Sequence, residues 1–395
     1  MNPHPAPPFP RRAPRPSRLF RRLLLPLLVL AVPAAALAAA IPAAPLAPGQ
    51  VSVPWLVVEL VVAMAVILTG CELFANGVEH VGEKAELSHA AAGSLLAAVG
   101  TALPETMIPI LAILFGAGGG HGESIGIGAI LGAPFMLSTL AFFLLGLTVT
   151  LHRALGGRPR WQMELNARSL AFELRWFLLT LLLVFGVSLA GRWLDAGPAR
   201  ALNLVAGAVV LVIYVFYFRH LLHHEAEEHE EYTDTFYFQK LFRLPRTWGT
   251  ILSQLALGLA AIIVGAHVFV GTIATLSMAI GVSSLVLSLI IAPIATELPE
   301  KYNSITWTLK RQDTLAMGNI SGALVFQTTI PVAVGLWFTE WRLGNTELLN
   351  LAFAGISALL VFLVLRASRR LPAWTLLVGG ILYGAYLGRI FVFGA

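Results

Sequence analysis

The residues best placed to do chemistry in this sequence are carboxylates inside long apolar stretches. Glu105 and Glu300 each end a Leu-Pro-Glu sequence, and the two sequences lie 195 residues apart. A third carboxylate, Glu297, lies three residues before Glu300. A carboxylate inside a membrane costs free energy unless it has a partner, and such residues usually serve a function. All three are therefore candidates for ion binding.

Hydroxyl-bearing residues and prolines lie close to these carboxylates in the sequence. Thr101 precedes Glu105 by four residues, as Thr296 precedes Glu300, so each hydroxyl shares a helix face with its carboxylate. Proline lacks an N–H group and leaves one helical carbonyl group without its hydrogen bond. The two segments contain three prolines: Pro104, Pro293 and Pro299. Carboxylate, hydroxyl and carbonyl oxygens together suit a hard cation such as Ca²⁺ or Na⁺.

A structural alternative is that each Pro-Glu pair only kinks its helix. Each Glu would then pair with a neighbour such as Lys301. Two copies at corresponding places in the chain favour the ion site over this alternative.

The composition predicts a membrane protein. Of the 395 residues, 57% are apolar and 12% are charged, and the mean hydropathy is +0.79, whereas a soluble domain carries about 25% charged residues. The net charge of +5 does not indicate a nucleic-acid partner, because six of the 26 Lys and Arg residues lie in the first 22 residues. A single cysteine, Cys71, excludes an intrachain disulfide and a cysteine metal cage. The expected partners are inorganic cations and the lipid bilayer, with no cofactor, nucleic acid or protein partner.

Apolar runs long enough to cross a bilayer predict an all-α polytopic protein with ten transmembrane helices in two sets of five. The first set covers roughly residues 54–75, 87–116, 125–151, 170–190 and 201–218. The second set covers roughly residues 249–276, 280–309, 314–338, 347–366 and 372–392. One set of alternate connections carries fourteen Lys and Arg residues and the other carries three, which places the richer set in the cytoplasm.

The apolar runs divide the chain into four segments. Residues 1–50 are expected to be a signal peptide or an uncleaved signal anchor with a Pro-rich spacer. Residues 51–218 and 249–395 form two repeats of five helices, separated by a His/Glu-rich cytoplasmic loop over residues 219–248. An odd number of helices per half requires homologous halves to be inverted in the membrane. Within the loop, residues 220–231 could bind a regulatory metal, although a solvated charged connection is the simpler interpretation.

Internal similarity supports the two repeats. The sequence GTALPE at residues 100–105 matches ATELPE at 295–300, and GAILGA at 128–133 matches GNISGA at 318–323. These motifs resemble the alpha repeats of the sodium/calcium exchanger family, in the cation/calcium antiporter superfamily. The resemblance covers about residues 54–392.

The resemblance implies two inverted five-helix halves, in which the Glu of each repeat coordinates the transported ion. It assigns the ligands by motif position: Glu105 and Glu300 at the centre, Thr101 and Thr296 beside them, and the backbone at Ala98 and Pro293.

Several positions depart from the family pattern. The Ser that follows Thr in the family is Ala102 in one repeat and Glu297 in the other. Further along, Ala133 and Ala323 replace Ser, and Leu137 and Gln327 replace an Asn or Asp. The site has therefore lost hydroxyl groups, gained Glu297 as a third carboxylate, and kept Gln327 as a neutral candidate ligand. These changes leave the counter-ion and the stoichiometry open.

The expected function is a secondary antiporter of the plasma (inner) membrane that exchanges Ca²⁺ for Na⁺ by alternating access. A proton/Ca²⁺ exchanger is the alternative, because three clustered carboxylates repel one another and Glu297 can carry a proton in place of a Na⁺. A membrane-embedded metal-dependent hydrolase is a distant alternative, because no nucleophile and base pair and no His-metal signature lies near the glutamates. The protein is thus not expected to be an enzyme.

We predict that Glu105→Gln and Glu300→Gln each abolish Ca²⁺ transport. A neutral amide cannot offset a divalent charge in a medium of low dielectric. Ca²⁺ flux into vesicles that contain each variant measures the effect. Near-normal flux in either variant would show that the central-ligand assignment is wrong.

Overall fold

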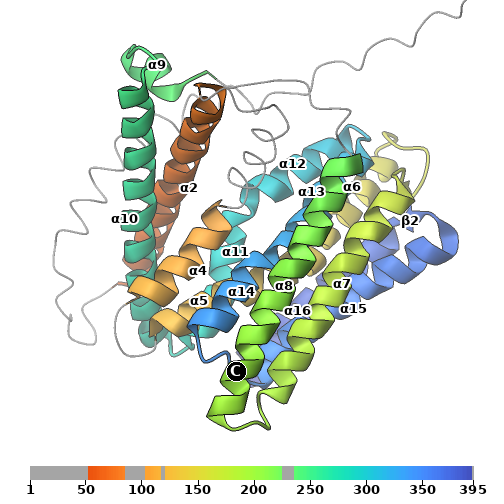
Figure 1. The fold of residues 1–395 in the computed structure, drawn as a ribbon. Coiled ribbons are helices and arrows are strands. Elements are labelled where there is room, and N and C mark those ends of the chain that lie inside the picture. The colour runs from red at the N-terminus through yellow and green to blue at the C-terminus, as the bar shows by residue number, and fades with distance from the viewer. Residues whose placement is uncertain (1–51, 85–102, 117–120, 225–234, 394–395) are drawn as a thin grey trace, which may run out of the picture.

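Helices account for nearly all of the chain that the computed structural model describes, namely residues 52–84, 103–116, 121–224 and 235–393 (Figure 1). The first half contains α2 (Val53–Lys84), α4 (Leu103–Phe115), α5 (His121–Met136), the π-helical turn η1 (Leu137–Ala141), α6 (Phe142–Ala154), α7 (Ala167–Ala190) and α8 (Ala196–His224). After the short helix α9 (Tyr237–Phe242), the second half contains α10 (Trp248–Ile280), α11 (Ser284–Thr296), α12 (Leu298–Leu309), α13 (Asp313–Gln327), α14 (Ile330–Phe338), α15 (Asn345–Ser368) and α16 (Ala373–Phe393). Each predicted apolar run coincides with one helix or with consecutive helices, where the structure describes it; of the run over residues 87–116, only 103–116 are described.

Eight helical spans in the described part are long and apolar enough to cross a membrane. The other two predicted crossings carry the acidic motifs. Their apolar helical segments are shorter: Glu105–Leu114 in α4, and Ser284–Ile294 in α11, which ends just before Glu297. The structure therefore confirms the all-helical multi-pass class with eight candidate membrane spans, and the ten-helix count stays a prediction. The predicted leader, 1–50, lies outside the described residues.

Helices α2 and α10 pack along each other and form a pair beside the larger helix bundle (Figure 1). Glycines allow this approach, because a Cβ atom on Gly70 would lie 2.7 Å from the carbonyl oxygen of Gly258. The relation is reciprocal, since a Cβ atom on Gly258 would lie 2.8 Å from the carbonyl oxygen of Gly70. Small residues that bring two helix backbones together are a common basis of packing in membranes.

The other helices pack in matching pairs from the two halves. Helix α4 packs against α5 as α12 packs against α13, and α4 packs against α14 as α12 packs against α6. Likewise α7 packs against α13 as α15 packs against α5, and α8 packs against α14 as α16 packs against α6. Two short strands, β1 (Gln162–Met163) and β2 (Leu371–Pro372), pair antiparallel and join a connection of the first half to one of the second. This matched packing is what two homologous halves would produce.

The basic connections gather at one end of the helices. The Nζ of Lys84 donates to the carbonyl oxygen of Arg246 at 3.0 Å, which joins the end of α2 to the start of α10. Helices α6 and α12 pack against each other in the upper part of the bundle (Figure 1). At the other end, Arg200 donates to the carbonyl oxygens of Trp337 at 2.5 Å and Thr339 at 3.1 Å. The two sets of connections that the sequence distinguishes by charge are thus also separate in space.

A buried ion pair joins two of the basic connections. Arg158 and Asp313 are 4% and 1% exposed, and the guanidinium donates to both carboxylate oxygens of Asp313. Arg158 also donates to the carbonyl oxygen of Thr308 at 2.7 Å, and the N–H of Glu164 donates to Asp313 at 2.6 Å. Such bidentate pairing satisfies charges that would be costly to bury alone.

We predict that Arg158→Ala lowers the free energy of unfolding by about 3–5 kcal/mol, because Asp313 would remain buried and unpaired. A control is Arg311→Ala, which removes an exposed pair with Glu164 whose atoms lie 3.9 Å apart. An exposed pair contributes at most about 1 kcal/mol. Denaturant unfolding of the purified variants in a mild detergent measures both changes, and equal losses would contradict the structural role of Arg158.

Candidate cation site

The second acidic motif lies where a helix breaks. Helix α11 ends at Thr296, α12 begins at Leu298, and Glu297 lies between them. Pro299 is in the first turn of α12, where a missing N–H costs no helical hydrogen bond. The single helix expected over residues 280–309 is therefore two helices, with Pro299 at the start of the second. The proline ring disfavours helical backbone at the residue before it, here Leu298. Helices therefore usually end before such a residue, as α11 does.

The structure brings the three predicted carboxylates into one buried region. Glu105 and Glu300 are each 8% exposed, and Glu297 is fully buried. Glu105 is close enough to Glu300 and Glu297 to be repelled by both, and close enough to Lys301 to be attracted by it. Glu300 lies in the first turn of α12, where the helix dipole favours a negative charge. The Oε2 atoms of Glu105 and Glu300 are buried, and neither has a hydrogen-bond partner among the described residues.

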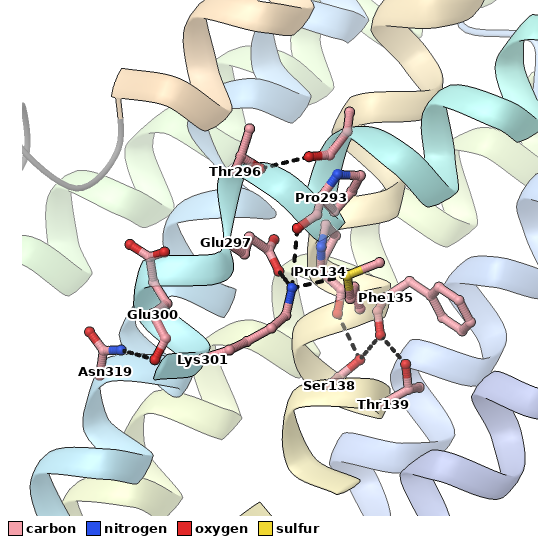
Figure 2. Close-up of polar contacts among 12 residues, drawn as sticks. Pro134, Phe135, Ser138, Thr139, Pro293, Thr296, Glu297, Glu300, Lys301 and Asn319 are labelled. Carbon is pink, nitrogen blue, oxygen red and sulfur yellow. Dashed lines mark hydrogen bonds and ion pairs between the residues drawn. The ribbon is translucent and has the colours of Figure 1, made fainter. Parts of the chain in front are cut away.

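Lys301 compensates the charge of Glu297 from the next turn of the chain (Figure 2). Its Nζ lies 3.4 Å from Glu297 Oε2. The same Nζ donates to the carbonyl oxygen of Pro293 at 3.1 Å and approaches the Met136 sulfur at 3.0 Å. Lys301 is 6% exposed and Met136 is fully buried, so the ammonium group is enclosed by protein.

Polar side chains of the motif helices hold these groups in place (Figure 2). The side-chain amide of Asn319 on α13 donates to the carbonyl oxygen of Glu300 at 3.2 Å and to Ser304 at 3.0 Å. The Thr296 hydroxyl donates to the carbonyl oxygen of Ala292 at 3.1 Å, which leaves the lone pairs of its oxygen for another partner. The GNISG motif thus positions the start of α12.

Close helix packing places α11 beside the first repeat. A Cβ atom on Gly132 of α5 would lie 2.1 Å from the carbonyl oxygen of Leu289 and 2.7 Å from the Pro293 ring. After α5, the π-helical turn η1 directs the hydroxyl of Ser138 to the Pro134 carbonyl oxygen at 2.7 Å (Figure 2). Turns of this type are frequent at functional sites.

Of the remaining predicted ligands, the structure describes Gln327 and Pro293 but not Ala98 and Thr101. Gln327 ends α13 and is 2% exposed, and within the described chain its Oε1 has no hydrogen-bond partner. The carbonyl group of Pro293 already accepts from Lys301. No described group of three or more His, Cys, Asp or Glu side chains is arranged to hold a metal ion, so a cation here would take most of its ligands from other oxygens.

The structural alternative named Lys301 as a partner for a glutamate, and the structure shows such a pair with Glu297, four residues away. The sequence analysis did not place two other residues, Cys71 and Tyr383, near the carboxylates. Cys71 of α2 lies near Glu105, and Tyr383 of α16 lies near Glu297. No sequence pattern indicates these two contacts, because they join helices far apart in the chain.

The predicted metal-binding loop is only partly described. His220 stacks on Phe172 of α7 with ring centroids 4.3 Å apart, and residues 225–231 lie outside the described chain. Metal binding by this loop stays a prediction.

Comparison with known proteins decides the family. The model of the family described as sodium/calcium exchanger protein matches residues 55–222 and 250–394, once in each half. The chain belongs to this family. The exchanger is 23% identical to the uncharacterized membrane protein MJ0091 of Methanocaldococcus jannaschii, over 76% of this chain and 86% of that protein. It is 25% identical to the putative antiporter CaxA of Alkalimonas amylolytica, over 70% of this chain and 78% of that protein.

Two solved structures share the fold of the exchanger. The H⁺/Ca²⁺ exchanger CAX superposes with a TM-score of 0.67 and 16% identity, over 93% of this chain and 88% of that chain. Native YfkE superposes with a TM-score of 0.61 and 14% identity, over 93% of this chain and 97% of that chain. Together with the eight spans, the family identifies an integral multi-pass membrane protein.

We predict that Gly132→Ala destabilises the exchanger by about 1–3 kcal/mol and slows transport, because the added methyl group forces α5 and α11 apart. A matched control is Gly186→Ala on the exposed side of α7, where nothing lies within 4 Å of the new Cβ atom. Unfolding in detergent and Ca²⁺ flux in vesicles measure the two effects. If the two variants behaved alike, the close packing of α5 on α11 would not matter for the site.

Proposed function

We propose that this exchanger is a secondary antiporter that moves Ca²⁺ against Na⁺ across the plasma (inner) membrane by alternating access. The observation that carries the proposal is the buried pair Glu105 and Glu300, one from each acidic motif, each with a carboxylate oxygen that has no described partner. Buried carboxylates of this kind mark ion pathways in membrane proteins. The match of the family model to both halves supports transport over hydrolysis.

The charges of the described groups suit a load of two positive charges. Glu105, Glu297 and Glu300 contribute three negative charges when ionised, and Lys301 contributes one positive charge. The resulting balance of two negative charges matches one Ca²⁺ or two monovalent cations. Either load leaves the site neutral, which lowers the cost of enclosing it in protein.

Alternating access follows from two inverted repeats, which we propose as the architecture of residues 51–218 and 249–395. The matched helix packing of the two halves supports this arrangement. The helix breaks between α11 and α12 and between α13 and α14 support it as well, since broken helices line the ion sites of many transporters. Residues 219–248 would connect the halves on the cytoplasmic side.

Ligands for the ion would come from both repeats. We assign the carboxylates of Glu105 and Glu300 as central ligands, with the hydroxyl groups of Thr101 and Thr296 beside them. Gln327 and the backbone at Ala98 are further candidates. Hydroxyl, amide and carbonyl oxygens of this kind complete the coordination of Ca²⁺ in proteins.

Proton/Ca²⁺ exchange is the second candidate, and Glu297 is the observation that favours it. Its carboxylate is fully buried and would be costly to keep ionised without a partner. Lys301 provides such a partner, which weakens the argument that repulsion among three carboxylates forces a proton onto the site. We therefore favour Na⁺ as the counter-ion.

Reconstitution of the purified protein into liposomes tests this choice. With the membrane potential clamped, an outward Na⁺ gradient is expected to drive Ca²⁺ uptake, and a proton gradient in Na⁺-free buffer is not. Liposomes that contain Glu300→Gln serve as the control for leakage. Uptake that follows the proton gradient and ignores Na⁺ would replace the Na⁺ proposal with the proton proposal, and no uptake under either gradient would contradict Ca²⁺ exchange.

A further inference from the structure

The Lys301 ammonium group lies among atoms of the kind that coordinate a metal cation. It is held by the Glu297 carboxylate, the Pro293 carbonyl oxygen and the Met136 sulfur, and the side chain is 6% exposed. Two of these three partners, Glu297 and Pro293, are candidate ligands for the transported ion. Carboxylate and carbonyl oxygens are ligands of hard cations in proteins, and the same atoms accept hydrogen bonds from an ammonium group.

The two repeats differ at the positions of this pair. Where the second motif has Glu297 and Lys301, the first has Ala102 and Thr106. The difference adds one negative and one positive charge together, so the net charge of the site stays the same. A lone Glu297 would instead add a third uncompensated carboxylate to the region of Glu105 and Glu300.

We propose that Lys301 is a tethered cation, which permanently occupies one monovalent-cation position of the exchanger site. This inference rests on the proposed function. The ammonium group takes the carboxylate and carbonyl oxygens that a Na⁺ would otherwise use, and it does so as a fixed charge. It thereby sets the number of monovalent ions that the site can bind, and it leaves Glu105 and Glu300 for the cargo.

A purely structural lysine leads to a different expectation. Removal of a structural ion pair destabilises the protein by the same amount at every Na⁺ concentration. Removal of a tethered cation opens a position that Na⁺ can fill, so the loss of stability shrinks as Na⁺ rises. Ions that bind only the folded state stabilise it by mass action, and the slope of stability against the logarithm of Na⁺ concentration counts the bound ions.

The test is denaturant unfolding of the purified full-length protein in detergent over a series of Na⁺ concentrations, with choline as the replacement cation. For Lys301→Met, which keeps the length of the side chain, the slope is expected to rise by one Na⁺ per protein over the wild type. For the double variant Glu297→Ala/Lys301→Thr, which copies the first repeat, the slope is expected to return to the wild-type value. An unchanged slope in Lys301→Met would overturn the proposal.

A second variant decides the question if Lys301→Met does not fold. Glu297→Ala leaves the ammonium group without its carboxylate, so it repels ions bound at Glu105 and Glu300. The apparent Kd for Ca²⁺, from stabilisation by added Ca²⁺, is then expected to rise at least about tenfold, and a change within about twofold would contradict the proposal.

Wild-type flux in liposomes is measured in parallel. Its absence would remove the proposed function, whereas active wild-type protein with unchanged ion binding in the variants would remove only the role of Lys301.

Discussion

The burial of two carboxylates from different helices in one region of low dielectric is the constraint on which the structure depends. Glu105 and Glu300 repel each other, and neither can be neutralised by solvent because both are nearly inaccessible. Their placement costs free energy, which the rest of the fold has to offset and which a bound cation would lower. The features around them reduce that cost: the dipole of α12 points its positive end at Glu300, and Lys301 removes the charge of Glu297.

Helix packing keeps these charged groups enclosed. Gly132 lets the backbone of α5 approach α11, and Asn319 ties α13 to the start of α12. At the basic end of the bundle, the buried pair of Arg158 and Asp313 links the connection after α6 to the connection before α13. The contacts thus extend from the site to one face of the molecule through helices of both halves. A cation that changes the charge balance at the break between α11 and α12 acts on elements that both repeats share.

The sequence predicted the class of the fold, and which carboxylates lie near each other, from strong local signals. Long apolar runs predicted the spans, and the two copies of Leu-Pro-Glu directed attention to Glu105 and Glu300. The sequence could not show that Pro299 begins a new helix, because a proline is compatible with both a kink and a first turn. It could not place Cys71 or Tyr383 beside the carboxylates either, since those contacts depend on how distant helices pack. The structure was also needed to see that the Glu297–Lys301 pair is buried. A Glu and a Lys four residues apart on a helix pair equally well on an exposed surface.

The most direct test of the account is to locate the bound ion. Crystals of the protein grown with Sr²⁺, a heavier analogue of Ca²⁺, would give an anomalous difference map that identifies the ion independently of the protein atoms. We expect a strong peak within coordination distance of both the Glu105 and Glu300 carboxylates, and none at the Lys301 ammonium group. A peak that lies away from both glutamates, or well-ordered glutamates with no peak at saturating Sr²⁺, would contradict it.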